Sequence, residues 1–342
     1  MAEVIEASAP ARIDLAGGTL DLWPLHVLHP GSVTVNLAID RRARCRIRRS
    51  ADGFVMRSPE RGLERRARRP SDLLADPATA LMGALLEAAG AAAPIEPLEF
   101  DLSSGVPYGS GLGGSSALLV AMAGALERFV AGRPSGAGAV RVDFVRDVET
   151  RVLGKPAGVQ DYYPPLYGGL QRIRFAAGET DAAREEVNPD LWDRHLTLYD
   201  SGAAHSSGMN NWEILRTRLE GDAAVAERLE GVRRAAADMA DAVASGDFAA
   251  MGRALGEEWD ARRLLAPVVS TPTLERAIAA ARQAGAWAGK ACGAGGGGCV
   301  VFLSPAPKTA AVRDALARLG EGSVLPVRAE NRGLEVSSVP AL

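Results

Sequence analysis

A glycine-rich segment in the first half of the sequence has the composition of a phosphate-binding turn. Residues 107–117 read Pro-Tyr-Gly-Ser-Gly-Leu-Gly-Gly-Ser-Ser-Ala. Glycines let backbone N–H groups approach phosphate oxygens, and a helix that begins there adds the positive end of its dipole. The segment lacks both the Gly-x4-Gly-Lys-Ser/Thr pattern and the dinucleotide fingerprint, and such a turn alone is as often a flexible linker. The candidate phosphate contacts are Pro107, Gly109, Ser110, Gly111, Leu112, Gly113, Gly114, Ser115 and Ser116.

Hydroxyl and carboxylate groups follow the glycines at spacings that suit magnesium-assisted phosphoryl transfer. Ser115 and Ser116 stand where the helix begins, so their hydroxyls either cap it or bind a magnesium ion carried by the phosphates. Glu149 and Asp161 follow, twelve residues apart. Magnesium needs a carboxylate besides the phosphates, and a hydroxyl nucleophile can use a second carboxylate as a base or orienting group. Glu149 could instead be an ordinary surface acid on its helix.

The hydrophobic pattern predicts the elements that would position these residues. A strand over residues 4–13 ends near Gly17 and Gly18, where consecutive glycines allow a tight turn and close approach to a ligand. A strand over 95–102 and a helix over 115–130 flank the glycine-rich segment. A helix over 142–153 carries Glu149, and an irregular connection over 154–169 carries Asp161.

The structure of three further segments is predicted from their spacing or their polarity. Residues 73–93 have helical spacing, the arginine-rich stretch 61–69 is predicted to be a loop, and the polar stretch 178–189 is predicted to connect two domains. Between Asp40 and Arg48 the arginines alternate with small or apolar residues, which predicts a strand with one solvated basic face. The arginines of that face are Arg42, Arg44, Arg46 and Arg48.

The length of the chain predicts two domains. Its 342 residues exceed the size at which a single core usually stops growing, roughly 250–300 residues. We place the boundary near residue 180, which gives domains 1–180 and 181–342. The second domain is predicted to contain a strand over 195–199, helices between 211 and 284, and a strand over 300–303.

The composition of the chain limits the classes of partner and the compartments that are expected. A net charge of −3 gives no general attraction to nucleic acid, so none is expected. The absence of an apolar leader in residues 1–10, and of a run of about 18 apolar residues elsewhere, argues against secretion and membrane spanning. Three cysteines without paired spacing fit free thiols, hence a cytoplasmic protein.

Three motifs together resemble the GHMP kinase superfamily, and they span residues 9–303. The first is Ala9-Pro-Ala-Arg-Ile-Asp-Leu-Ala-Gly-Gly18, the second is the glycine-rich segment 107–117, and the third is Lys290-Ala-Cys-Gly-Ala-Gly-Gly-Gly-Gly-Cys299. The resemblance implies an α+β fold with a ribosomal protein S5 domain 2-like N-terminal domain and a ferredoxin-like C-terminal domain. The site would lie in the cleft between them.

The resemblance also implies roles for individual residues. The second motif would wrap the phosphates of ATP, with Mg2+ held by Ser115 or Ser116 and by Glu149. Asp161 would face the substrate hydroxyl, and Arg12 would stabilise charge on the transferred phosphoryl group. The implied substrate contacts are Gly17, Gly18, Asp21, Gln160, Gly295 and Gly296.

Within the superfamily, the sequence looks most like the sugar kinases. Asp21 follows Arg12 by nine residues, as the sugar-binding aspartate of galactokinase-like members does, and a carboxylate suits a polyhydroxylated ligand. Residues 158–163, Gly-Val-Gln-Asp-Tyr-Tyr, are similar to the heptose 7-phosphate kinase and fucokinase-like branches, which implies phosphorylation of an anomeric hydroxyl. Galactose itself is not expected, because Gly18 and Thr19 replace the Glu and His of the galactokinase motif.

Two alternatives stay open from the sequence. One is a mevalonate-series kinase or the related decarboxylase, which shares the second motif. The other is a catalytically silent sugar or nucleotide sensor on the same scaffold. The expected partner in every case is a small molecule, and the chain is expected to be a monomer or a homodimer.

Overall fold

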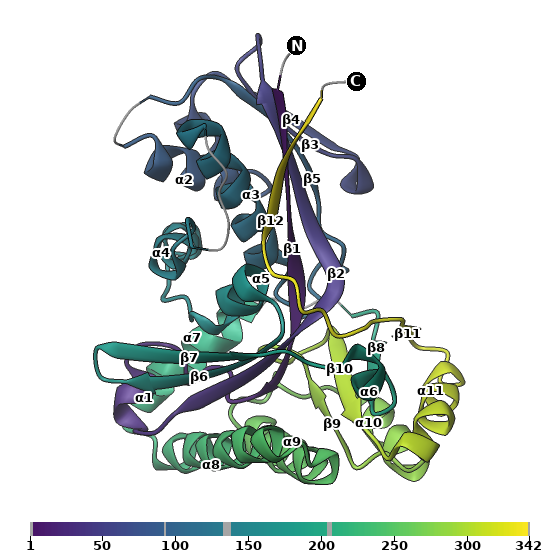
Figure 1. Cartoon of the computed structure of the whole chain (residues 1–342). Helices are drawn as coiled ribbons and strands as arrows, with labels where there is room; N and C mark the ends of the chain where they lie inside the picture. Colours follow the sequence, from purple (N-terminus) through teal and green to yellow (C-terminus); the bar gives the residue numbers. More distant parts are fainter. Residues whose placement is uncertain (1–2, 92–93, 133–137, 204–206, 341–342) are drawn as a thin grey trace.

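The protein consists of two stacked halves joined by two long strands. The computed structural model describes residues 3–91, 94–132, 138–203 and 207–340. In Figure 1 the strands β1 (Glu3–Ala16) and β2 (Val33–Arg49) run from the upper half into the lower one. Because Arg12 and Asp14 lie near the lower end of β1, the candidate site lies where the halves meet.

A large mixed sheet fills the upper half and extends into the lower one, where β6 and β7 lie in Figure 1. Its order is β12-β1-β2-β5-β3-β4, and β6 pairs with the first residues of β2 and with β7. All pairs are antiparallel except β3 with β5. The remaining strands are β3 (Phe54–Ser58), β4 (Leu63–Ala67), β5 (Leu98–Ser103), β6 (Leu170–Ala176), β7 (Glu179–Glu185) and β12 (Glu335–Pro340).

Helices cover one face of this sheet. They are α2 (Ala80–Ala89), α3 (Gly114–Ala131), α4 (Val142–Leu153) and α5 (Tyr163–Tyr167). Of the described helices, α3 alone is long and apolar enough to cross a membrane. Its apolar residues, such as Leu119 and Leu126, are buried in the core of the upper half, which accounts for that composition.

The lower half contains a four-stranded antiparallel sheet of order β11-β8-β10-β9. Taken in chain order, this is the 4-1-3-2 arrangement of a ferredoxin-like domain, so the predicted α+β class and two-domain fold are confirmed. The strands are β8 (Leu196–Asp200), β9 (Ala288–Ala291), β10 (Cys299–Leu303) and β11 (Ser323–Leu325).

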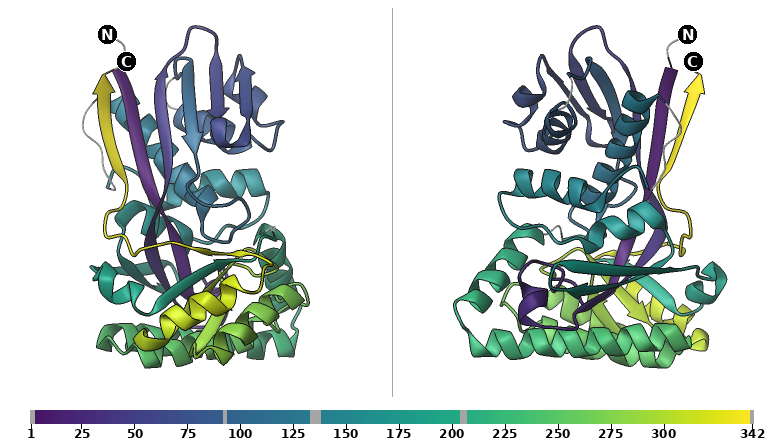
Figure 2. Two further views of the ribbon diagram at one scale, coloured as in Figure 1. Left: turned by 90° about the vertical axis from the view of Figure 1, so that its right-hand side faces the viewer. Right: turned by 60° about the vertical axis from the view of Figure 1, so that its left-hand side comes forward.

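Long helices pack below and behind this sheet (Figure 2). The helices outside the upper half are α1 (Leu25–Leu28), α6 (Pro189–Asp193), α7 (Ser207–Leu219), α8 (Ala223–Ser245), α9 (Phe248–Arg262), α10 (Pro272–Gln283) and α11 (Thr309–Ala317). Four short 3-10 turns complete the elements: η1 (Pro59–Arg61), η2 (Pro70–Leu73), η3 (Gln160–Tyr162) and η4 (Ala306–Lys308).

The two halves share a hydrophobic core. One buried cluster joins Ile13 of β1 and Leu37 of β2 to Leu255 of α9 and Val301 of β10. The last strand, β12, returns to the upper half and pairs with β1, so both ends of the chain lie close together in Figure 1. The boundary near residue 180 stays a prediction, and that residue lies inside β7.

Two stretches that are polar in the sequence contain strands: the predicted loop 61–69 and the predicted domain connection 178–189. The first contains β4, and the second contains β7. Both form hairpins at the edge of the large sheet, with most side chains exposed. The alternation that reveals a strand needs one buried face, and these two edge strands have almost none. The helix predicted over 73–93 is also shorter, because α2 occupies only residues 80–89.

The basic face predicted for β2 is confirmed with one exception. Arg44, Arg46 and Arg48 are exposed, whereas Arg42 is buried. Arg42 is buried because the C-terminal segment covers it. Its guanidinium donates to the carbonyl of Gly333 in that segment at 2.6 Å and to the carbonyl of Ser8 in β1 at 2.9 Å. A guanidinium with several acceptors tolerates burial.

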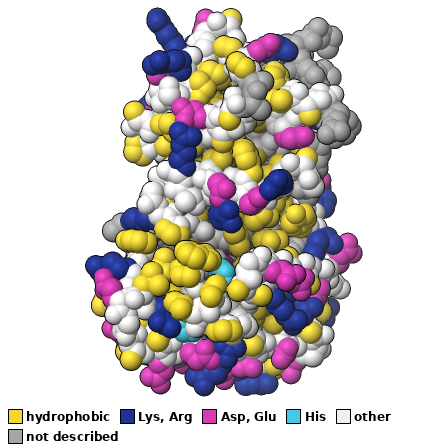
Figure 3. All heavy atoms as spheres, turned by 90° about the vertical axis from the view of Figure 1, so that its left-hand side faces the viewer, with side chains coloured by type: hydrophobic (Ala, Val, Ile, Leu, Met, Phe, Trp, Pro, Cys, Tyr) yellow, Lys and Arg dark blue, Asp and Glu magenta, His cyan; other side chains and the backbone are white. Residues whose placement is uncertain are grey.

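One face of the surface carries mixed charge, and the free thiols expected from the sequence are confirmed. On the face in Figure 3, basic and acidic side chains are interspersed, so this face has no uniformly basic field. Cys45, Cys292 and Cys299 are free thiols and all three are buried.

Candidate functional site

The core of the candidate site is an ion pair between β1 and the turn before α5. Arg12 is buried, and its Nε and Nη2 donate to Oδ1 of Asp161 at 2.9 and 2.7 Å. Burial lowers the pKa of Arg12, but the carboxylates of Asp161 and Asp14 outweigh it and leave the pKa raised. Arg12 is therefore a fixed cation beside a carboxylate that is still partly open to solvent.

The glycine-rich segment lies directly against this pair. Nη1 of Arg12 donates to the carbonyl of Gly111, and the backbone N–H of Arg12 donates to the carbonyl of Leu112 at 2.9 Å. A Cβ on Gly113 would lie 3.2 Å from Cγ of Arg12. The sequence-predicted phosphate contacts and Arg12 thus belong to one compact unit.

The conformation of that segment requires glycine. Gly109, Gly111 and Gly113 have φ values of 68°, 74° and 70°, in the left-handed region. Gly113 precedes the first residue of α3, so the first turn of this helix directs N–H groups toward the segment. Such an end of a helix is suited to phosphate oxygens.

The third glycine-rich motif supports the second from behind. The N–H of Cys299 donates to the carbonyl of Ser110 at 2.8 Å. A Cβ on Gly298 would lie 2.6 Å from that same carbonyl oxygen, and one on Gly293 would lie 3.2 Å from the oxygen of Gly111. The close approach explains why glycines recur in the third motif.

Gly295 and Gly296 of the third motif lie against the backbone of Val269 rather than against the second motif. The N–H of Gly296 donates to the carbonyl of Val269 at 2.7 Å, and a Cβ on Gly295 would lie 2.4 Å from the same oxygen. Their predicted role as substrate contacts stays a prediction.

The predicted magnesium ligands are brought together. Oγ of Ser116 donates to Oε2 of Glu149 at 3.2 Å, and the hydroxyl of Tyr162 donates to the same oxygen. Burial raises the pKa of Glu149, and the nearby charge of Asp161 adds to the effect against the hydrogen bond from Tyr162. Ser115 is exposed at the start of α3.

This donor set fits magnesium. A carboxylate and one or two hydroxyls are hard oxygen ligands, and Mg2+ in kinases takes few protein ligands besides substrate phosphates. Within the described residues there is no group of three or more His, Cys, Asp or Glu side chains that could hold a metal by themselves. Glu149 and Ser116 would then hold the ion jointly with phosphate oxygens.

A second polar array lies close to Asp161. Asp21 is buried, and its Oδ2 accepts from the N–H of Gln160 at 3.1 Å. Burial, and then the negative charge of Asp161, raise the pKa of Asp21 to about 7. Oε1 of Gln160 accepts from Nδ2 of Asn36 at 3.1 Å. These groups offer hydrogen bonds of both kinds, which is what a polyhydroxylated ligand needs.

The paired glycines after β1 make room for this array. A Cβ on Gly18 would lie 2.5 Å from Oδ2 of Asp14 and 2.7 Å from Nε2 of Gln160. One on Gly17, at φ 87°, would lie 2.0 Å from the carbonyl oxygen of Val33. The tight turn is therefore present and lies close to other protein groups, whereas its approach to a ligand stays a prediction.

Several residues of the site carry no clear signal in the sequence. Asn36 lies within β2, and Tyr162 directly follows Asp161. A Cβ on Gly158 would lie 1.9 Å from Oδ2 of Asp21, so this glycine makes room for the carboxylate. These contacts join segments more than 100 residues apart, and a linear pattern does not reveal them.

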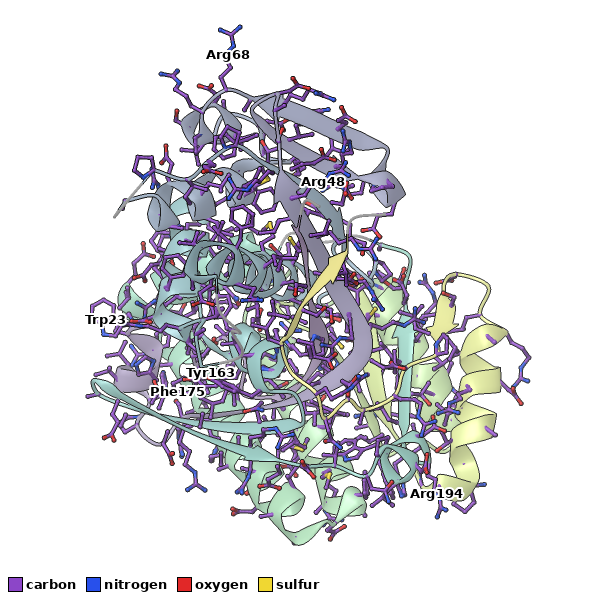
Figure 4. All side chains as sticks on the ribbon, turned by 45° about the horizontal axis from the view of Figure 1, so that its top comes forward. Trp23, Arg48, Arg68, Tyr163, Phe175 and Arg194 are labelled. Atoms are coloured by element: carbon purple, nitrogen blue, oxygen red, sulfur yellow. The ribbon has the colours of Figure 1, made fainter. Side chains whose placement is uncertain are left out.

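The arginine clusters of the upper sheet lie away from the site. Figure 4 shows Arg48 and Arg68 in the upper half, whereas Tyr163, two residues after Asp161, lies much lower. Arg48 forms an ion pair with Glu99. The labels of Trp23, Tyr163 and Phe175 stand together on the left of the same view.

The sequence matches two family descriptions. Residues 77–169 match the GHMP kinases N terminal domain, and residues 239–322 match GHMP kinases C terminal, which together cover more than half of the chain. The first region includes the second motif, Glu149 and Asp161, and the second includes the third motif.

Individual relatives are also kinases. A D-glycero-alpha-D-manno-heptose 7-phosphate kinase of Campylobacter jejuni is 27% identical over 312 residues, covering 88% of this chain and 89% of that protein. A mevalonate kinase of Methanothermobacter thermautotrophicus is 29% identical over 305 residues, covering 87% and 90%. Among solved structures, a D-glycero-D-manno-heptose 1-phosphate kinase from Bacteroides thetaiotaomicron superimposes with a TM-score of 0.78 over 98% of this chain and 100% of that chain. At 22% identity, this last likeness establishes the fold alone.

Proposed function

The chain belongs to the GHMP kinase family, and from that premise we propose that it transfers the γ-phosphoryl group of Mg-ATP to a sugar hydroxyl. The acceptor we propose is the anomeric hydroxyl of a heptose 7-phosphate or a related sugar. Membership makes the protein a phosphotransferase with an alcohol group as acceptor. The finer assignment rests on the residues around Asp161.

One observation supports the proposal above the others. Arg12 contacts Asp161 with two nitrogens and the glycine-rich segment with a third. A single cation therefore joins the group that would orient the acceptor hydroxyl to the segment that would hold the phosphates. Phosphoryl transfer depends mainly on such positioning and on stabilisation of charge.

The residues have distinct roles in this proposal. Asp161 orients the acceptor hydroxyl and receives its proton, and Arg12 stabilises the charge of the transferred group. The N–H groups of residues 109–116 bind phosphate oxygens, while Glu149 and Ser116 hold Mg2+, which neutralises phosphate charge when it is bound. Asp21 and Gln160 bind acceptor hydroxyls, and Gly17, Gly18, Gly295 and Gly296 shape the acceptor side.

The buried carboxylate of Asp21 supports a sugar rather than an apolar acceptor. Burial and the negative charge of Asp161 raise its pKa to about 7, so further hydrogen-bond donors would favour its charged form. A ligand with several hydroxyls would supply them, whereas an isoprenoid precursor offers few. The mevalonate kinase relative keeps mevalonate as the second candidate. We further propose that the enzyme works in the cytoplasm, as a monomer or a homodimer.

An ADP-release screen tests the proposal. Purified protein with Mg-ATP would be supplied with free hexoses, heptoses, their phosphates, galactose and mevalonate, each against an acceptor-free control. We expect release with a heptose phosphate or related sugar and none with galactose, and 31P NMR should place the new phosphate on C1. Release with mevalonate alone would overturn the sugar assignment. Tight sugar binding without ADP release from any acceptor would indicate a silent sensor.

A further inference from the structure

Four charged side chains lie completely buried between β1, β9 and α9. The exposed fraction is 0% for Asp14, Glu258 and Lys290, and 1% for Arg262. Nζ of Lys290 lies 3.0 Å from Oδ2 of Asp14 and 3.8 Å from Oε1 of Glu258. The same oxygen of Glu258 accepts from Nε and Nη2 of Arg262 at 2.8 and 2.7 Å. The two acids and two bases balance each other.

This buried cluster continues the ion pair of the candidate site. Asp14 follows Arg12 by two residues, so both point to the same side of β1. Burial by itself would raise the pKa of Asp14, but Lys290, Arg262 and Arg12 outweigh it and keep the pKa below its ordinary value. Charges therefore alternate from Asp161 through Arg12 and Asp14 into the cluster.

The other end of the cluster holds the turn that precedes Asp21. Nη2 of Arg262 donates to the carbonyl of Gly18 at 2.6 Å, and its Nη1 donates to Oγ1 of Thr19 at 3.2 Å. Oγ1 of Thr19 donates in turn to Oδ1 of Asn211 at 2.8 Å. Thr19 has φ 75°, a conformation that residues with a branched Cβ rarely adopt. These contacts from α9 and α7 hold the turn in a conformation that it would not favour alone.

The chemistry of the cluster indicates positioning rather than stability. Buried ion pairs are often no more stabilising than apolar residues of the same volume, because removing charges from water is costly. A guanidinium, however, holds two acceptors in a fixed fork, which a single ammonium group cannot do. Arg262 uses one side of that fork for Glu258 and the other for the turn.

We propose that Arg262 is a positioning residue for the acceptor: it holds the Gly17–Asp21 turn so that Asp21 meets Gln160 and the acceptor hydroxyls. Glu258 orients the guanidinium, and Lys290 balances the charge of Glu258 and Asp14. The proposal rests on the proposed function, since it treats Asp21 as an acceptor contact. It adds that acceptor affinity depends on a residue of α9 that does not touch the acceptor.

Steady-state kinetics of four variants and one control variant test this. Arg262→Lys keeps the positive charge but loses the fork, and Arg262→Gln loses both. Thr19→Ala removes both the hydroxyl and the γ-methyl, whereas Thr19→Ser removes only the methyl and keeps the hydroxyl. Arg253→Gln, on the exposed side of the same helix, is the control. We expect the acceptor KM to rise about tenfold or more in Arg262→Lys and Thr19→Ala, the loss expected for a charge-assisted hydrogen bond. Thr19→Ser and Arg253→Gln should match the wild type.

The comparison between the change in the acceptor KM and the change in the KM for ATP decides the result. The KM for ATP should stay within about twofold, because the glycine-rich segment does not contact Arg262. Equal changes in both KM values, or an unchanged acceptor KM, would overturn the proposal. If the Arg262 variants do not fold, the Thr19→Ala and Thr19→Ser pair gives the answer.

Hydrogen exchange followed by mass spectrometry separates this proposal from the proposed function. In ligand-free Arg262→Lys, amides of residues 17–21 should exchange faster than in the wild type, with residues 107–117 unchanged. If no acceptor supports ADP release by the wild type, the proposed function fails while this measurement still tests the positioning. Unchanged exchange at residues 17–21 would refute it.

Discussion

Arg12 and Asp161 are 149 residues apart in the sequence, yet two guanidinium nitrogens of Arg12 lie within 2.9 Å of one carboxylate oxygen of Asp161. β1 fixes the arginine, and the turn before α5 fixes the aspartate. The second oxygen of Asp161 is left for another partner. A carboxylate held on one side by a cation and open on the other is well placed to orient a hydroxyl nucleophile.

Replacing Asp161 with asparagine should abolish turnover and leave nucleotide binding intact. The amide keeps the size of the side chain but accepts no proton, so we expect kcat to fall by about a thousandfold or more. Binding of an ATP analogue, measured by calorimetry, should change less than about threefold. Asp181→Asn, at an exposed position of β7, is the control. Retention of most of the activity in Asp161→Asn would remove Asp161 from the proposed mechanism.

Replacing Glu149 with glutamine should change the magnesium requirement. The glutamine amide still accepts hydrogen bonds from Ser116 and Tyr162, but it loses the charge that a divalent ion needs. We expect the Mg2+ concentration for half-maximal activity to rise by roughly tenfold or more. The matched control is Asp147→Asn, on the same helix but exposed. An unchanged Mg2+ titration in Glu149→Gln would assign Glu149 to the fold alone.

The sequence predicts the site better than it predicts the sheet. Gly109, Gly111 and Gly113 are recognisable because their left-handed backbone tolerates few other residues, so the constraint is local. Likewise, α4 occupies the residues predicted for it, since its apolar positions face a core. Where structure follows from local sterics or from one buried face, a linear pattern is enough.

The remaining features depend on contacts that close only in three dimensions. The edge strands β4 and β7 expose most of their side chains, so no alternation marks them. The strand β12 exists because the chain returns to β1, and this return also buries Arg42. The charges of Glu258 and Arg262 lie on a helix whose sequence looks amphipathic and polar, and only β1 and β9 explain their burial.

Asp21 makes the pH dependence of stability predictable. Its pKa is about 7 in the folded protein, against an ordinary value near 3.8. Between those values the folded state keeps a proton that the unfolded state releases, so the contribution of Asp21 to the free energy of unfolding falls as pH rises. The loss is complete above about pH 7 and absent below about pH 4.

Asp21→Asn should therefore be more stable than the wild type at pH 8, with the difference shrinking toward pH 5. Thermal melts across this range measure it. The same variant should bind the sugar more weakly at pH 8. Its amide lacks the negative charge of the ionised carboxylate, which accepts stronger hydrogen bonds from sugar hydroxyls. The wild-type acceptor KM should rise as pH falls through 7, and that of Asp21→Asn should not. A variant less stable than the wild type at every pH would contradict the assigned direction.

The contact between the second and third glycine-rich motifs predicts a difference between two glycine-to-alanine variants. Gly298 has φ 71°, and a Cβ there would lie 2.6 Å from the carbonyl oxygen of Ser110. Gly154 has φ 61°, but nothing lies within 4 Å of its missing Cβ. Both variants should strain the backbone by about 1 kcal/mol, and only Gly298→Ala should also displace the glycine-rich segment 107–117.

We expect Gly154→Ala to lower the melting temperature modestly and to leave the kinetics unchanged. Gly298→Ala should lower the melting temperature further and raise the KM for ATP by about tenfold, because displaced N–H groups no longer match the phosphate oxygens. The acceptor KM should change less, since the side-chain hydrogen bonds of Asp21 and Gln160 within the described residues run to each other and to Asn36, and not to the third motif. Equal kinetic effects of the two variants would mean that the third motif does not hold the glycine-rich segment 107–117 in place.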